Sequence, residues 1–214
     1  KLTKKFEDAR KKIADYLNSV VSGAEAKALE AEVGDSSVLV ASEHILKVCQ
    51  ALKDSDEHQY NVLQTISGVD YPEGVGEDKT PVIEVNYMIA SFIKNTEIIL
   101  KLRVPRGDDE NLPKVDSVCS VWTAADWQER ECYDLVGVEF VNHPDHRRIL
   151  NPYDWKGHPL RKDYKAQEVY QGMTVYPEDK QNIPEQDFIV EQNKLNDEAK
   201  AAAKKAREEA KKDN

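Results

Sequence analysis

Residues 122–164 read WTAADWQERECYDLVGVEFVNHPDHRRILNPYDWKGHPLRKDY, and this stretch decides how the rest of the chain is interpreted. It holds all three tryptophans and three of the five histidines of the protein. A helix is expected over residues 124–136, because neither Gly nor Pro interrupts that segment and Gly137 is typical of a helix C-terminus. Thr123 is the expected N-cap, and Asp126 places an acid near the positive end of the helix dipole.

One face of this helix is expected to combine Trp127, Glu131 and Asp134, which stand at i, i+4 and i+7. Glu129 and Arg130 then point elsewhere. The helix therefore offers carboxylates to whatever segment packs against it.

An irregular, charge-dense loop follows the helix. A short β-prone run at 138–141 comes first, and Pro144 ends it because proline favours an extended conformation at His143. Gly157 and Pro159 then prevent a long helix further along.

Basic residues outnumber acidic ones in this loop. Residues 143–165 carry the bases Arg147, Arg148, Lys156, Arg161, Lys162 and Lys165 and the acids Asp145, Asp154 and Asp163. An acidic helix followed by a basic loop predicts bidentate arginine–carboxylate pairs that fasten the loop to the helix. The expected partners are Glu131 or Asp134 with Arg147 or Arg148. If buried, such a network contributes more to the specificity of the fold than to its stability.

Two runs of residues at fixed spacing give the stretch a family resemblance. The first reads E-R-E-x2-D-x2-G-x2-F-x2-H-P-D-x-R-R-I-L from residue 129, and the second reads GHPLRKDY from residue 157. Together they closely resemble the signature of the 30 kDa subunit family of respiratory complex I, NADH:quinone oxidoreductase. The signature residues, expected at an interface between subunits, are Glu129, Arg130, Glu131, Asp134, Gly137, Phe140, His143, Pro144, Asp145, Arg147, Arg148, Gly157, Pro159, Leu160, Arg161, Lys162, Asp163 and Tyr164. Two positions depart from the family pattern: His146 replaces an apolar residue, and Lys165 stands where a proline often follows the tyrosine.

The resemblance implies a function. It implies a cofactor-free structural subunit in the peripheral arm of a proton-translocating NADH:quinone oxidoreductase, a translocase of the respiratory chain. NADH, FMN, iron–sulfur clusters and quinone such as ubiquinone would belong to partner subunits, and the chain would have no catalytic residues of its own. It would brace the large subunit that forms the quinone site, as a peripheral protein on the cytoplasmic side of the bacterial inner membrane. Related membrane-bound hydrogenases and F420-type dehydrogenases carry a similar subunit, so the electron donor stays open.

The segments before this stretch predict an α+β fold. Helical patterns are expected over 1–21, 24–32 and 43–52, the last capped by Ser42, and strands over 37–41, 60–67 closed by Gly68, 82–92, 96–104 and 115–121. The strands at 82–92 and 96–104 form a hairpin through Lys94-Asn95. This order predicts a mostly antiparallel sheet with helices packed on one face, as the resemblance also implies.

Four parts are expected along the chain. They are an N-terminal helical segment (1–33), the α+β domain (34–165), an extended partner-binding arm (166–190) and a charged Ala/Lys/Glu helix (191–214). The arm has no hydrophobic period and is interrupted by Gly172, Pro177 and Pro184, so it is expected to be ordered only along a partner surface. The terminal helix is either exposed or docked on a partner, and the basic face of the first helix is either solvated or membrane-bound.

Composition excludes several classes. The net charge of −10 argues against a general nucleic-acid binder. No run has the length of a transmembrane helix, and no signal-peptide pattern opens the sequence. The three cysteines lack CxxC spacing, so neither a disulfide framework nor an iron–sulfur site is expected.

A stand-alone metal-dependent hydrolase is the alternative from another class. It would use His143 and His146, with His158 and Asp145 as further ligands. A His-x-x-His pair in a loop lacks the second pair that a zinc site requires, so no metal is expected. Glu129 and Glu131 point apart on a helix and are expected in ion pairs rather than as a catalytic carboxylate pair.

Overall fold

The computed structural model describes residues 2–29, 37–75 and 79–175, with side chains described from Arg10 onward. It divides into two compact units, Lys1–Lys165 and Ala166–Asn214. The predicted terminal helix at 191–214, and the predicted arm beyond residue 175, lie outside the described residues. The four-part division of the chain stays a prediction.

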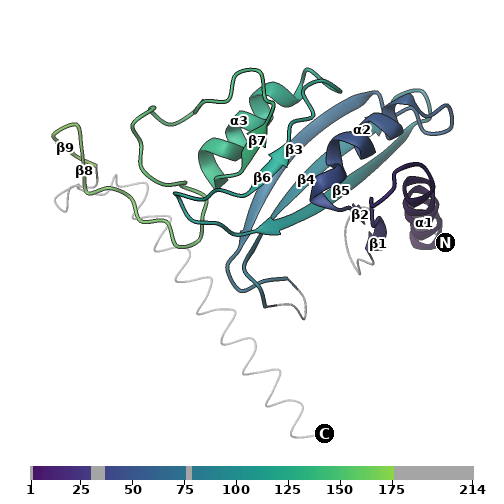
Figure 1. The fold of residues 1–214 in the computed structure, drawn as a ribbon, viewed down its shortest axis with the longest axis horizontal. Helices are drawn as coiled ribbons and strands as arrows, with labels where there is room; N and C mark the ends of the chain where they lie inside the picture. The colour runs from purple at the N-terminus through teal and green to yellow at the C-terminus, as the bar shows by residue number, and fades with distance from the viewer. Residues whose placement is uncertain (1, 30–36, 76–78, 176–214) are drawn as a thin grey trace, which may run out of the picture. The chain divides into compact units, whose positions relative to one another are not determined.

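A five-stranded sheet is the centre of the first unit (Figure 1). Its strand order is β1-β2-β5-β4-β3. The strands are β1 (Lys27–Leu29), β2 (Ser37–Leu39), β3 (Val62–Tyr71), β4 (Val82–Ser91) and β5 (Thr96–Pro105). Every neighbouring pair is antiparallel except β2 and β5. The predicted hairpin is confirmed, since β4 and β5 pair continuously from Ser91↔Thr96 to Val82↔Pro105.

The sheet has one apolar face and one polar face. Along β4, alternate residues Ile83, Val85, Tyr87 and Ile89 are completely buried in the core. Glu84 points to the other face, where it pairs with Lys101 and Arg103 of β5. Because only one face is apolar, the helices must cover that face, and Figure 1 shows α2 (Ile45–Asp54) in front of it. The predicted α+β class with a mainly antiparallel sheet is confirmed.

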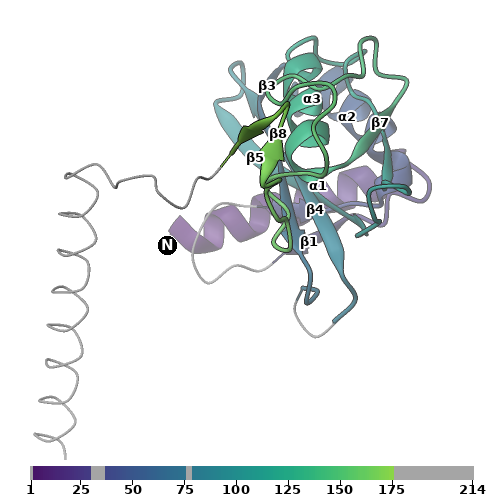
Figure 2. The same ribbon diagram turned by 90° about the vertical axis from the view of Figure 1, so that its left-hand side faces the viewer.

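Two further helices complete the layer. They are α1 (Leu2–Val20), which Figure 2 shows lengthwise, and α3 (Ala125–Val136). A 3-10 turn, η1 (Ser42–His44), precedes α2. Beside α3, the short strands β6 (Lys114–Asp116) and β7 (Glu139–Val141) pair in parallel. This pair brings both ends of the segment 117–138 together at the base of α3.

Gly68 does not close its strand, so that prediction is wrong. β3 continues through it to Tyr71. A Cβ atom on Gly68 would lie 2.8 Å from Cys132 Sγ and 3.1 Å from Val136 Cγ2, both on α3. The glycine is therefore required because α3 crosses the strand at very short range, a packing role rather than a turn.

Three smaller expectations are also wrong. Residues 24–32 do not continue as a helix after Gly23, because β1 begins at Lys27 and pairs with β2. Neither Ser42 nor Thr123 caps a helix with its side chain within the described part of the chain. The N-cap of α3 is Ala124, and the turn before it is held by main-chain hydrogen bonds such as Asp126 N–H to Thr123 O (3.3 Å).

The second unit contributes little described structure. Its strands β8 (Val169–Tyr170) and β9 (Met173–Thr174) form a small antiparallel hairpin. Among the described residues of both units, no helix combines the length and apolarity needed to cross a bilayer.

Candidate functional site

Asp134, in the last turns of α3, organises the loop that follows it. Its side chain is completely buried. Oδ1 accepts hydrogen bonds from Arg148 Nη1 (2.7 Å) and Asn151 Nδ2 (2.9 Å). Oδ2 accepts three main-chain N–H groups, those of Ile149 (3.1 Å), Leu150 (2.7 Å) and Asn151 (2.7 Å). The predicted pairing of Asp134 with Arg148 is confirmed, and the carboxylate also fixes three consecutive residues of the loop backbone.

These contacts keep Asp134 ionised. Burial alone would raise the pKa of its carboxyl, but hydrogen bonds from Asn151, Arg148 and Leu150 outweigh burial and hold the pKa below its usual value. Arg148 also donates to Asp134 O and, through Nη2, to Gly157 O (both 3.1 Å). One arginine therefore joins the helix to a distant point of the loop.

Arg130 is a second buried fastening from α3. Its Nε donates to Arg147 O (3.2 Å) and its Nη2 to Arg148 O (3.3 Å). Its Nη1 lies 3.4 Å from Asp145, which also pairs with the exposed Arg147 at 2.9 Å. Glu131, the other predicted carboxylate partner, is exposed, and no ion pair joins it to a described residue. The expectation that Glu131 and Asp134 share an environment is wrong, because only Asp134 faces inward.

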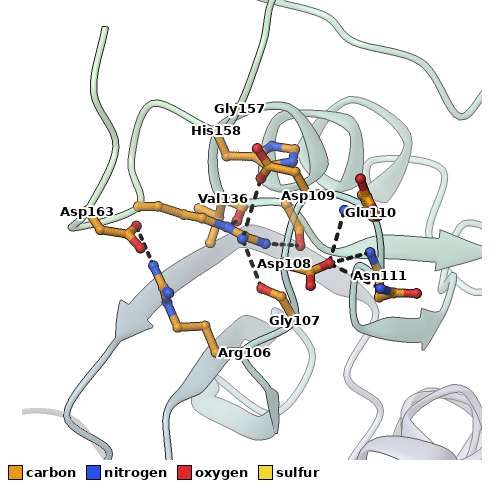
Figure 3. Close-up of polar contacts among 12 residues, drawn as sticks. Arg106, Gly107, Asp108, Asp109, Glu110, Asn111, Val136, Gly157, His158 and Asp163 are labelled. Carbon is orange, nitrogen blue, oxygen red and sulfur yellow. Dashed lines mark hydrogen bonds and ion pairs between the residues drawn. The ribbon is translucent and has the colours of Figure 1, made fainter.

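Arg161 fastens the far end of the loop. Its buried guanidinium donates to three main-chain carbonyls: Val136 O (2.8 Å), Gly107 O (2.9 Å) and Gly137 O (3.3 Å). Figure 3 shows these acceptors around one centre, with Asp109 3.6 Å from the same guanidinium. Arg161 therefore ties the loop to α3 and to the segment after β5.

A second arginine, Arg106 at the end of β5, works beside it (Figure 3). It forms a bidentate pair with the buried Asp70 (2.6 and 3.0 Å) and reaches Asp163 at 2.5 Å. Asp70 also accepts the main-chain N–H of Lys162 (2.8 Å). The loop is thus held at its end by β3 and β5 as well as by α3.

Gly137 makes these contacts sterically feasible. It ends α3 in the left-handed conformation (φ 83°), as predicted. A Cβ there would lie 2.6 Å from His158 Cδ2 and 2.7 Å from Arg161 Nη2. Both its conformation and the space around it therefore require glycine.

The predicted histidine cluster does not converge on one point. His146 Nε2 accepts the N–H of Phe140 (3.0 Å), and His158 Nδ1 donates to Asp134 O (3.0 Å). His143 Nε2 donates to Asp126 O (3.0 Å), while its Nδ1 accepts the N–H of Asp145 (3.0 Å). Burial lowers the pKa values of His146 and His158, which favours their neutral forms. Each ring therefore fixes the backbone rather than sharing a ligand with the others.

A different group of possible metal ligands does meet, namely Cys119, Glu129 and His143, whose donor atoms all lie within 4.8 Å. Glu129 is completely buried and accepts the N–H of Val118 (2.7 Å) and the thiol of Cys119 (3.4 Å). Burial raises the pKa values of Glu129 and of Cys119, the latter to about 12. The protonation of His143 opposes a metal, because a metal on Nε2 would place the ring proton on Nδ1, against the N–H of Asp145. The trio fits a hydrogen-bonded cluster better than a metal site.

The anchored loop exposes large apolar side chains. Leu150, Tyr153 and Leu160 are 62%, 92% and 56% exposed. Leu150 follows directly from the backbone held by Asp134, and the N–H of Leu160 bonds Leu135 O at the end of α3 (2.8 Å). At the inner side, Tyr164 accepts a hydrogen bond from Trp155 Nε1 (3.0 Å), and Phe140 lies in the core. The loop is therefore stiff and presents apolar groups outward.

Sequence reasoning missed Asp70, Arg106, Asp109 and Cys119 as members of the site. Each lies outside the signature runs and joins it only through the fold. An arginine directly after a long hairpin strand was the available signal for Arg106, and an acid at the strand terminus was the signal for Asp70.

Comparisons with known proteins agree with one another. Residues 38–170 match the family described as "Respiratory-chain NADH dehydrogenase, 30 Kd subunit". The chain is 43% identical over 143 residues to a subunit of NADH-quinone oxidoreductase from Geotalea uraniireducens, covering 65% of this chain and 80% of that protein. It is 35% identical over 177 residues to the protein of the same name from Mycobacteroides abscessus, covering 78% and 74%. One chain of an archaeal membrane-bound sulfane sulfur reductase has the same fold, with a TM-score of 0.59 at 22% identity over 83% of this chain and 99% of that one.

Proposed function

The chain belongs to the 30 kDa subunit family of respiratory-chain NADH dehydrogenase, and on that premise we propose that it is a structural subunit of an NADH:quinone oxidoreductase. In this role it holds no cofactor and carries out no chemical step. It braces the large subunit that forms the quinone site, in the peripheral arm on the cytoplasmic side of the membrane. NADH, FMN, iron–sulfur clusters and quinone belong to its partners.

The stiff signature loop with its exposed apolar side chains is the observation that supports this proposal. An exposed loop backbone is normally mobile, but here Asp134, Arg130 and Arg161 hold it at successive points. A large exposed apolar side chain such as Tyr153 costs solubility unless a partner covers it. A pre-formed surface loses little conformational entropy on binding, which suits a permanent contact between subunits.

The use of the charged groups supports a structural role over a catalytic one. The two oxygens of Asp134 already accept five hydrogen bonds, and the guanidinium of Arg161 donates to three carbonyls. Groups so fully engaged in holding the backbone are poorly placed to exchange protons with a substrate. The unusual charge density of the signature is therefore explained by the shape of the loop.

Arg147 and Tyr153 provide the test, because both side chains are exposed and neither holds the loop to α3. In cells that make the complete assembly, Tyr153→Ala and Arg147→Ala are expected to reduce the amount of assembled complex on native gels. The complex that does assemble is expected to keep its turnover per complex. Lys47→Ala, an exposed position on α2, is the matched control and should assemble normally.

The opposite pattern would contradict the proposal. A fully assembled Arg147→Ala complex without turnover would indicate a chemical role for the loop. Purification of the wild-type chain from gently solubilised membranes as a free monomer would contradict its assignment to a larger assembly.

A further inference from the structure

A second feature of the fold lies away from the signature loop. A cavity of about 520 Å³ opens between α1, the segment after α2 and the turn that joins β4 to β5. We call it the hairpin pocket. Its apolar lining includes Ile13, Tyr60, Ala90 and Ile98, all of which are buried. Its volume falls in the range of pockets that accept a side chain or a small ligand.

Two buried nitrogen atoms that line this pocket have no hydrogen-bond partner among the described residues. They are Nε of Arg10 and Nε2 of His58. Arg10 is almost completely buried, and its Nη1 donates to Leu29 O. His58 packs edge-on against Tyr16 with ring centroids 4.7 Å apart. Leaving a buried donor unpaired costs about 1–3 kcal/mol, so the pair indicates an acceptor supplied from outside.

The rim of the pocket carries exposed apolar groups. Phe92 and Ile93, in the turn between β4 and β5, are 75% and 67% exposed, and Phe92 itself lines the pocket. Adjacent large apolar side chains that project into solvent beside a cavity are typical of a protein-binding surface. A small ligand inside the pocket would leave Ile93 uncovered.

We propose that the hairpin pocket is a second docking site, which receives from a partner subunit a segment with an apolar side chain next to a carboxylate. The apolar side chain would occupy the space above Tyr60 and Ile98. The carboxylate would accept hydrogen bonds from Arg10 Nε and His58 Nε2, with Lys12 and Lys94 contributing positive charge at the rim.

This inference rests on the proposed function only in taking the partner to be a member of the same assembly. A membrane surface fits less well for two reasons. The unpaired donors lie inside the pocket, where a lipid headgroup layer does not reach. The rim also holds Glu57 and Glu97, which anionic lipids would repel.

The pocket is also separate from the family signature. One wall is built by Arg10, Lys12 and Ile13 of α1, and the family match begins at residue 38. The other wall, from residue 57 onward, lies within the matched region. The partner segment should therefore be found in assemblies in which the member of this family has this first helix.

Photo-cross-linking in the complete assembly tests the proposal. A benzophenone amino acid is placed at Ile93, and in a parallel strain at Tyr153 on the signature loop. The expected result is an adduct between position 93 and a peptide of a partner subunit in which an apolar residue stands within a few positions of Asp or Glu, identified by mass spectrometry. Arg10→Met should lower the yield of that adduct about tenfold, since losing one charge-assisted hydrogen bond changes a binding constant by about that factor.

A second variant guards against misfolding of the first. His58→Phe keeps the ring beside Tyr16 and removes the nitrogen, so it should also lower the yield while the melting temperature stays near that of the wild type. An unchanged yield in both variants would overturn the role of the two nitrogens and with it the proposal.

The companion position separates the two proposals. Adducts from position 93 only to lipid or to this chain itself, with a partner peptide captured at position 153, would overturn the hairpin pocket and leave the proposed function intact. Capture at position 93 but not at 153 would support the pocket and contradict the role given to the signature loop. Partner adducts at neither position would overturn both.

Discussion

Asp134 Oδ1 lies 2.7 Å from Arg148 Nη1, and the same carboxylate holds the main chain directly after that arginine. The ion pair and the backbone contacts are therefore parts of one arrangement. The arginine brings the loop to the helix, and the second oxygen, Oδ2, sets the backbone conformation from Ile149 to Asn151.

Replacement of Asp134 by Asn should strongly destabilise the first unit. The amide cannot accept at both oxygen positions, so its NH2 group would face either the three main-chain N–H groups or Arg148. Removing one member of a buried ion pair costs about 3–5 kcal/mol. Urea denaturation should show this loss, whereas Glu131→Gln, at an exposed position on the same helix, should change the free energy of unfolding by less than about 0.5 kcal/mol. Equal effects of the two variants would refute the central place given to Asp134.

Glu129 should make stability depend on pH with the opposite sign to Asp134. Burial raises the pKa of its carboxyl above the ordinary value of 4.5, so the folded state binds the proton more tightly than the unfolded state. The favourable contribution of this group is complete below 4.5 and is lost as the pH rises through the raised pKa. Glu129→Gln keeps an acceptor for Val118 but does not titrate.

The measurement is urea denaturation of wild type and Glu129→Gln from pH 4 to pH 8. The stability of the wild type relative to the variant should fall with rising pH and then level off. A difference between the two proteins that does not change with pH would contradict this account.

Gly137→Ala should cost about 3 kcal/mol. The left-handed conformation costs a non-glycine residue about 1–2 kcal/mol, and forcing an extra carbon into a packed site costs about 1–3 kcal/mol more. Gly157→Ala is the matched control, because φ is 76° there and the nearest atom, of Tyr164, would lie at 3.2 Å rather than 2.6 Å. Thermal melting of both variants separates the two contributions, and a smaller loss for Gly137→Ala than for Gly157→Ala would disprove the steric one.

Arg161→Lys should loosen both segments that the arginine joins. A lysine retains the charge but cannot donate to Val136, Gly107 and Gly137 at once. The loss in unfolding free energy is expected to be about 1–3 kcal/mol, since two buried acceptors lose their partner. Amide hydrogen exchange should accelerate around residues 107 and 137. Lys162→Arg, at the exposed neighbour, should leave exchange unchanged, and faster exchange in the control alone would argue against this role for Arg161.

Zinc should not be retained by the trio of Cys119, Glu129 and His143. The hydrogen bond from Asp145 N–H to His143 Nδ1 leaves the proton on the nitrogen that a metal would need. After incubation with one equivalent of Zn²⁺ and desalting, elemental analysis should find no stoichiometric metal. Stoichiometric zinc that disappears in Cys119→Ser would show that the cluster is a metal site.

The sequence predicted those features that depend on local chemistry. Gly137 ends α3 as expected, and the charges of Asp134 and Arg148 identified them as partners. The hairpin of β4 and β5 followed from alternating apolar residues around a short polar turn. The α+β class follows from these elements and their order.

Other features depend on the tertiary fold and leave little trace in the sequence. Asp70 accepts a hydrogen bond from Lys162, 92 residues away, and only the sheet topology brings them together. Gly68 resembles a turn residue, because the approach of α3 to the strand cannot be deduced from neighbouring residues. The three main-chain donors held by Asp134 carry no residue type at all, so its role as a backbone anchor could not be predicted.

The last turn of α3 has one more consequence. Its carbonyl groups at residues 134–137 accept hydrogen bonds from Arg148, His158, Leu160 and Arg161, all in the loop that follows. Neither segment can detach without stripping the other of its partners, so helix and loop form one cooperative opening unit. A protease should therefore find no cleavage site in this long irregular loop until the helix beneath it also unravels.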